Sequence, residues 1–175
     1  MIEQRKFRQA LPLLERAVTI NLAQRSEIYE DLAYTFANRA IAKRGLGDLT
    51  GASSDFVRAQ RAAVVHHHRN LAPIMTDLAE IRCTQNDVSA GLGLLDRAMP
   101  IMAKTYPDDP WRTAWVTNTR GYCLARQGDR FGATRALKES SSALQQRWAK
   151  DSLYGRMVAD RLSNLSSSQK TLRPQ

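Results

Sequence analysis

A pattern of small and large apolar residues recurs about every 40 residues and limits the fold more than any other feature of the sequence. A small residue comes first, a large apolar residue follows four positions later, and a second small residue stands three positions after that. Small residues let two helices approach closely, and the large residue fills the space between them. We call this pattern the small–large–small motif. Its four copies are Ala10–Leu14–Ala17, Ala52–Phe56–Ala59, Gly91–Leu95–Ala98 and Ala133–Leu137–Ser140.

Turn signals follow the same spacing. Gly47-Asp48, Asn86-Asp87 and Gly128-Asp129 each join a residue that tolerates left-handed backbone to a residue that caps a helix N-terminus. Each dipeptide therefore predicts a tight corner between two helices. Longer breaks separate the helix pairs, the clearest being 106–110, which contains two prolines. The N-caps expected after these breaks are Ser26, Asn70, Asp109 and Asp151.

These signals predict an all-α chain of eight antiparallel helices, because no segment shows the sustained alternation of a strand. Three full helix pairs, flanked by two single helices, would form one α-α superhelix, or solenoid, over residues 1–168. The pairs are 26–68, 71–105 and 110–149, the single helices are 3–23 and 152–167, and 169–175 is a polar tail. The expected helices are 3–23, 26–45, 48–68, 71–85, 88–105, 110–127, 130–149 and 152–167.

At these residues the chain resembles the tetratricopeptide repeat (TPR) family. Ala52, Phe56 and Ala59 match the second half of the family motif, and the segment 38–48 is similar to a variant of the first half. Leu78-Ala79 and Arg120-Gly121 stand where the family has Leu-Gly. The long repeat is similar to the kinesin-light-chain variety, which also occurs in large bacterial signalling proteins. The resemblance implies a protein-binding scaffold without catalytic activity or cofactor.

In that family the first helix of each pair lines a concave groove that binds peptides or partner segments. Trp115, Asn118, Tyr122 and Arg126 lie three or four residues apart, so they share one face of a first helix. An aromatic pair beside arginine can stack and bind a carboxylate, although core packing is the alternative, above all for Trp115. The groove residues implied by the resemblance are Tyr34, Asn38, Arg44, Asp77, Glu80, Trp115, Asn118, Tyr122, Arg126 and Arg161.

Positive charge is concentrated in the C-terminal part of the chain. Residues 110–175 carry 12 Lys and Arg against 4 Asp and Glu, whereas residues 1–109 carry 14 against 13. This asymmetry predicts an acidic protein or peptide partner. Two alternatives stay open: nucleic-acid binding through the basic half, and a regulatory solenoid that senses a peptide. Nucleic acid is the less favoured because the basic residues fall on both kinds of helix.

The remaining reactive residues suggest no chemistry. Three consecutive histidines, 66–68, would point in different directions on a helix and cannot converge on one metal ion. Asp77 and Glu80 share a helix face, but a polar groove wall is a simpler role than acid–base catalysis. We expect Cys83 and Cys123 to be unpaired, buried small residues in a reducing cytoplasm.

The N-terminal segment has an unpartnered apolar stripe. Phe7, Leu11, Leu14 and Val18 recur at three- and four-residue steps. Residues 3–23 thus predict a second helix of a pair whose first helix is missing. We expect self-association through this helix, or attachment of the chain to a larger protein. No apolar run is long enough to cross a membrane, and no secretory signal is recognisable.

Overall fold

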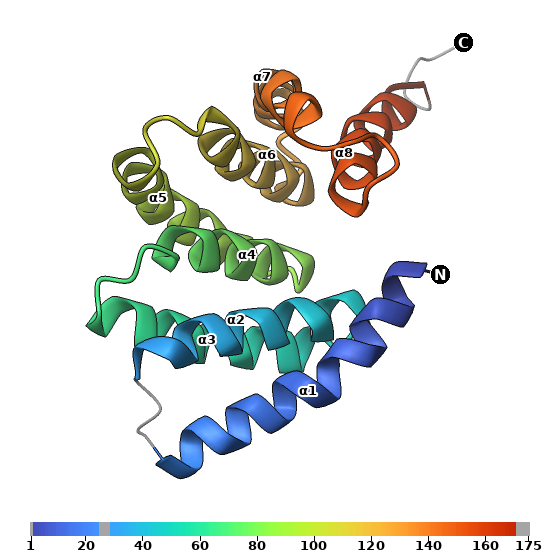
Figure 1. Cartoon of the computed structure of the whole chain (residues 1–175). Helices are drawn as coiled ribbons and strands as arrows, with labels where there is room; N and C mark the ends of the chain where they lie inside the picture. The colour runs from blue at the N-terminus through green and yellow to red at the C-terminus, as the bar shows by residue number, and fades with distance from the viewer. Residues whose placement is uncertain (1, 25–28, 171–175) are drawn as a thin grey trace. The chain divides into compact units, whose positions relative to one another are not determined.

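A computed structural model describes residues 2–24 and 29–170, with side chains over 6–24 and 29–165. These residues form α-helices and no strand (Figure 1), which confirms the predicted all-α class. Their boundaries lie close to the predicted ones. The helices are α1 (Ile2–Gln24), α2 (Glu30–Gly45), α3 (Leu49–Val65), α4 (Leu71–Thr84), α5 (Val88–Thr105), α6 (Pro110–Gln127), α7 (Arg130–Arg147) and α8 (Leu153–Lys170).

The three predicted corners are built as expected. Gly47, Asn86 and Gly128 have φ angles of 89°, 66° and 92°, in the left-handed region. The aspartate that follows each of them accepts a hydrogen bond from a backbone N–H three residues later. These bonds satisfy amide groups that a helix N-terminus leaves without intrahelical partners. The repeat boundaries are therefore local features of the sequence.

Several helix ends differ from the prediction. Asp109 precedes α6 without a side-chain capping bond, α7 ends at Arg147 instead of residue 149, and α8 ends at Lys170 instead of residue 167. α3 stops at Val65, so the three histidines form a turn after the helix instead of its last residues. His67 has a φ angle of 48°, and His68 Nδ1 accepts a hydrogen bond from the Asn70 backbone N–H. At the start of α8 the cap is Ser152, whose Oγ accepts from the Gly155 N–H at 3.0 Å, in place of Asp151. Ser26 lies outside the described residues.

The chain divides into two compact units within α4. Unit 1 ends at Ile81, and unit 2 begins at Arg82. A single domain over 1–168 remains a prediction. Residues 169 and 170 of the predicted polar tail belong to α8, and the rest of the tail lies outside the described residues.

The small–large–small motif is the contact between paired helices. In unit 1, α2 packs on α3, and all three motif residues of α3 are 0% exposed: Ala52, Phe56 and Ala59. In unit 2, α6 packs on α7, and a Cβ added to Gly121 of α6 would lie 2.7 Å from Leu137 Cγ. The two helices approach so closely that only glycine fits there without a shift of its neighbours.

Overpacking this contact should destabilise the protein. Replacing Ala52 with Leu adds three carbon atoms where α3 meets α2, so we expect the free energy of unfolding to fall by roughly 1–3 kcal/mol. Ala103→Leu, on an exposed position of α5, is the matched control and should change it little. Urea denaturation followed by circular dichroism measures both. Equal stability of the two variants would show that α3 does not meet α2 at Ala52.

Candidate functional site

The predicted groove residues of unit 1 form an ion cluster between α2 and α4. Arg44 Nη1 lies 3.1 Å from Asp77 Oδ1 and 3.5 Å from Glu80 Oε2. All three side chains are less than one-fifth exposed. The two carboxylates therefore face a cation of the same unit, which stabilises the packing of one first helix on the next. A polar groove wall fits this arrangement better than a pair of acid–base catalysts.

Two further cations of α2 are bound to a buried carboxylate. Asp55 on α3 is 2% exposed, and its carboxylate binds Arg39 through two hydrogen bonds of 2.6 and 2.7 Å and Lys43 at 2.8 Å. Burial raises the pKa of Asp55, but the hydrogen bonds and positive charges of Arg39 and Lys43 outweigh it and hold the pKa below its usual value. These cations therefore link α2 to α3.

The other predicted residues of unit 1 are more accessible. Tyr34 is 58% exposed on α2, so its ring can contact a partner directly. Asn38 lines an open apolar groove between α1 and α2. The structure therefore separates Tyr34 and Asn38 from the buried ion cluster.

In unit 2 the predicted constellation comes together around a buried arginine. Arg161 of α8 is 8% exposed, and its Nη1 donates a 2.7 Å hydrogen bond to Asn118 Oδ1. Its guanidinium carbon lies 5.1 Å from the centroid of Trp115 and 4.8 Å from that of Tyr122, within cation–π distance. Asn118 is fully buried and donates its second bond to Ser140 Oγ at 3.1 Å. The structure thus brings these four predicted residues together, and their role in binding stays a prediction.

Burial gives this constellation a supporting role in unit 2. Trp115 is 7% exposed and packs with Leu144 and Val158 in the core between α6, α7 and α8. Asn118 joins α6 to α7 and to α8 through its two hydrogen bonds. A side-chain amide bonded on both sides fixes how these three helices pack.

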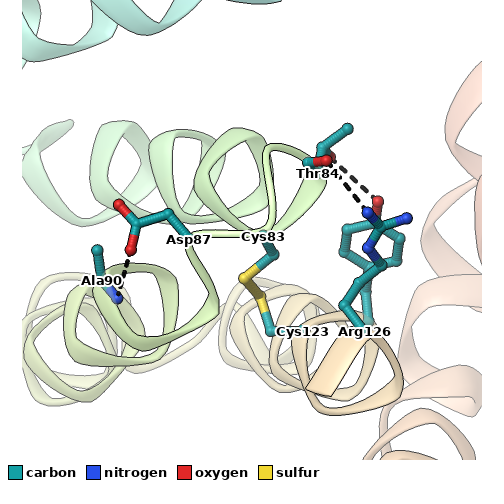
Figure 2. The surroundings of a disulfide bond; sticks show 7 residues. Cys83, Thr84, Asp87, Ala90, Cys123 and Arg126 are labelled. Carbon is teal, nitrogen blue, oxygen red and sulfur yellow. Dashed lines mark hydrogen bonds between the residues drawn. A yellow bond between two sulfur atoms is a disulfide. The ribbon is translucent and has the colours of Figure 1, made fainter. Parts of the chain in front are cut away.

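Tyr122 and Arg126, one turn apart on α6, contact the end of α4. The hydroxyls of Tyr122 and Thr84 are 3.1 Å apart. Arg126 Nη2 donates to the Thr84 carbonyl at 3.3 Å (Figure 2). It also donates to Asn86 Oδ1 at 2.5 Å. Arg126 is exposed, so its guanidinium is held in place and remains in reach of solvent.

A disulfide beside Arg126 corrects the prediction of two unpaired cysteines. Cys83 and Cys123 are buried, as expected, but they are bonded to each other across Cα atoms 5.3 Å apart (Figure 2). They are 40 residues apart in sequence, about one repeat. Stacking of repeats brings the first helices of successive repeats side by side, so residues about one repeat apart can meet. That spacing was the signal that could have predicted the bond.

Sequence analysis missed a second group of aromatic and basic residues. Trp148 stacks on Tyr154 at 4.8 Å between ring centroids and meets Trp111 and Trp115 edge-on at 5.7 and 5.1 Å. The guanidinium carbons of Arg112 and Arg147 lie 4.5 and 5.1 Å from the Trp111 centroid. We call Trp111, Arg112, Arg147, Trp148 and Tyr154 the arginine–aromatic surface. All five are half-buried or exposed. The signal was the Trp-Arg pair at 111–112 and the Arg-Trp pair at 147–148.

Among residues 2–24 and 29–170 no group of three or more His, Cys, Asp or Glu could hold a metal ion. Within the same residues, no helix is both long and apolar enough to cross a bilayer.

Comparison with known proteins identifies the fold. Neither the protein-family models nor the curated proteins gave a match to the sequence. Among solved structures, a Podosopora anserina protein described as a kinesin light chain with nearly identical TPR-like repeats matches 97% of this chain and 82% of its own, at 16% identity and a TM-score of 0.67. BtubC (BKLC) from P. vanneervenii matches 97% of this chain and 77% of its own, at 15% identity and a TM-score of 0.66. This chain has the TPR-like solenoid fold. The predicted family resemblance is thus supported by structure.

Removing the buried charge of Asp55 should make unfolding easier and change its pH dependence. The folded pKa of Asp55 is lowered, so its stabilising effect is present above the usual aspartate pKa and is lost as the pH falls through the folded pKa. We expect Asp55→Asn to lower the free energy of unfolding by about 3 kcal/mol at neutral pH, because Arg39 and Lys43 lose their partner. Urea titrations from pH 7 down to about pH 3 should show this difference shrinking in acid.

Asp96→Asn is the control, because Asp96 forms an exposed ion pair with Arg120 and should contribute less than about 1 kcal/mol. A loss of stability for Asp55→Asn that is the same at pH 7 and pH 3 would contradict the assigned role of the carboxylate.

The disulfide should stabilise the chain by restricting its unfolded state. For the 40-residue separation of Cys83 and Cys123, loop-closure entropy gives at most about 4 kcal/mol. We therefore expect a thiol reductant to lower the melting temperature of the natural chain. The double variant Cys83→Ala, Cys123→Ala should melt lower without reductant and show no response to it. Identical melting of the natural chain with and without reductant would rule out the bond.

Proposed function

We propose that the chain is a protein-interaction scaffold that binds an acidic peptide or partner segment mainly through unit 2. The arginine–aromatic surface carries this proposal. Arg112 and Arg147 each lie over Trp111, so their guanidinium groups are held beside an apolar ring. Arg112 also pairs with Asp109 at 3.1 Å, so the exposed Arg147 is the main cation offered to a partner. A guanidinium can bind a carboxylate through two parallel hydrogen bonds, and Trp, Tyr and Arg dominate the energetics of protein interfaces.

The charge of unit 2 supports an acidic partner. The segment 110–175 has three times as many basic as acidic residues. Exposed Arg126, Arg135, Lys138, Arg147 and Lys150 belong to this excess. A positive field accelerates the encounter with an acidic segment and disfavours basic ones.

We further propose that this partner lies along the concave groove of first helices that the TPR-like fold implies. In unit 2, Arg126 is the exposed member of the predicted set and would contact it directly. Trp115, Asn118 and Arg161 would act indirectly, by fixing the packing of α6 against α7 and α8. Trp115→Ala is therefore a poor probe of binding, since it opens a cavity in the core of unit 2.

We also propose that the protein acts by binding alone, without catalysis, and that it does so in the cytoplasm. The cysteine bond bears on the compartment, because disulfides persist in oxidising surroundings and are kept reduced in most cytosols. In a cytoplasmic protein Cys83 and Cys123 would spend most of their time as thiols. Alkylation of the chain in intact cells, followed by mass spectrometry, distinguishes the two states.

Reversing one charge of the arginine–aromatic surface should weaken binding to an acidic probe. With a fluorescein-labelled decaglutamate peptide, we expect Arg147→Glu to raise the Kd at least about five-fold, as loss of one ion pair of about 1 kcal/mol requires. Arg97→Glu, an equal charge change on an exposed position of α5, is the matched control. Fluorescence anisotropy measures both. Equal weakening by the two variants would reduce the effect to net charge and contradict the assigned surface.

A labelled random single-stranded oligonucleotide tests the alternative partner. Tighter binding of the oligonucleotide than of decaglutamate, with a log–log salt slope of several units, would replace the protein-binding proposal by nucleic-acid binding. Weak binding of the oligonucleotide at physiological salt would support the proposal.

A further inference from the structure

The small–large–small motif of α1 lacks the cover that its counterparts have. The motif residues of α3 and α7 are at most 1% exposed, because α2 and α6 pack on them. Leu95 and Ala98, the corresponding motif residues of α5, are also fully buried. Ala10, Leu14 and Ala17 of α1 are only half-buried. α1 is thus a second helix whose packing surface is open among the described residues.

This open surface is part of a groove of about 400 Å³ between α1 and α2. Ala10, Leu13 and Leu14 of α1 form one wall, and Asn38 and Ile41 of α2 form the other. Leu13 is 71% exposed at its edge. The groove adjoins the α1–α2 interface, where Phe7 packs against the backbone of Gly45 so closely that a Cβ would not fit.

The α6–α7 pair shows what shape fills such a groove. There Gly121 of the first helix lies against Leu137 and the carbonyl oxygen of Ala133. Leu137 and Ala133 occupy the motif positions that Leu14 and Ala10 occupy in α1. A helix that completes α1 must therefore present glycine or alanine towards Leu14. A larger side chain would hold the two backbones apart.

The residues that line the groove also restrict the charge of a helix that could bind there. Asn38 and Ile41 stand one repeat before Asp77 and Glu80, which bind Arg44 of the preceding first helix. Because Asn38 and Ile41 are neutral, an incoming helix has no carboxylate to pair with a basic residue there. Lys6, exposed one turn before Ala10, favours the C-terminal end of an incoming antiparallel helix, where the helix dipole and a free carboxylate are negative.

We propose that the α1–α2 groove binds an amphipathic helix of another protein. The helix runs antiparallel to α1 and presents a small residue to Leu14, a neutral residue to Asn38 and Ile41, and a negatively charged C-terminal end to Lys6. A second copy of α1 is a poorer occupant. Its C-terminal turn, residues 21–24, carries no acidic side chain that could meet Lys6. This site lies in unit 1 and does not depend on the arginine–aromatic surface.

Leu13 stands at the position of α1 that Asp55, the partner of Arg39 and Lys43, occupies in α3. The probe is therefore a peptide that copies residues 29–46, the first helix of a complete pair, with Arg39→Gln, Lys43→Gln and Arg44→Gln. It keeps Ala40 as its small residue, ends in a free carboxylate, and carries a hydrocarbon staple on its solvent face and a fluorescein label. With the full chain we expect saturable binding. Leu13→Glu in the chain should raise the Kd at least about ten-fold by placing a charge at the groove edge. Leu13 is exposed, so this change should leave the fold intact.

Two controls make the assignment specific. Val64→Glu, an equal change on an exposed position of α3 in the same unit, should leave the Kd unchanged. A peptide that also carries Ala40→Leu should bind at least about ten-fold more weakly, because the close approach is lost. No binding of the first peptide, or equal binding to the chain with and without Leu13→Glu, would overturn the proposal.

Sedimentation velocity of the natural chain tests the other occupant. A monomer over a wide concentration range supports a partner helix. A reversible dimer that Leu13→Glu abolishes would assign the groove to a second copy and overturn the proposal. The peptide-binding and sedimentation results do not depend on decaglutamate binding. The proposals for unit 1 and unit 2 are therefore tested independently.

Discussion

The close approach of two helices at a residue without a bulky side chain is the contact on which the described structure depends. At Gly121 the backbone of α6 comes so near to Leu137 that even a methyl group would force a shift. On α3, which packs on α2, the small residues Ala52 and Ala59 are likewise fully buried. A small residue buries little apolar area of its own, but it lets two helix backbones come into dispersion contact. The large residue at the centre of each motif then fills the remaining space.

Charge is distributed around this frame in two ways. In unit 1 the cations of α2 are bound internally, Arg39 and Lys43 by Asp55 and Arg44 by Asp77 and Glu80. In unit 2 the exposed Arg147 lies over the ring of Trp111, whereas Arg112 also pairs with Asp109 and the buried Arg161 donates to Asn118. A guanidinium over a ring keeps N–H groups available to a further acceptor, whereas a bidentate ion pair uses them. This contrast is why we place recognition of an acidic partner in unit 2.

The fold could be predicted almost completely because its signals are local. Each Gly-Asp or Asn-Asp corner needs only a left-handed residue and a capping carboxylate, and the motif spacing supplies the pairing. The site could be predicted only in part. Trp115, Asn118 and Tyr122 do share a face, but helical periodicity cannot tell whether α8 covers that face, and it does so through Arg161. The arginine–aromatic surface was missed because it draws on the ends of three helices. The disulfide was missed because its cysteines are 40 residues apart, and only the stacking of successive first helices brings them together.

The bond between Cys83 and Cys123 also affects how the chain would behave under load. A helical solenoid pulled from its ends lengthens as successive helices are stripped from their neighbours. Here the covalent bridge carries the tension past the intervening segment, which includes all of α5 and the first three turns of α6. About 130 Å of potential extension, taken at 3.3 Å per residue, is thereby withheld until the bond is reduced. The redox state of the Cys83–Cys123 pair would then decide whether this segment can unfold and lengthen under load.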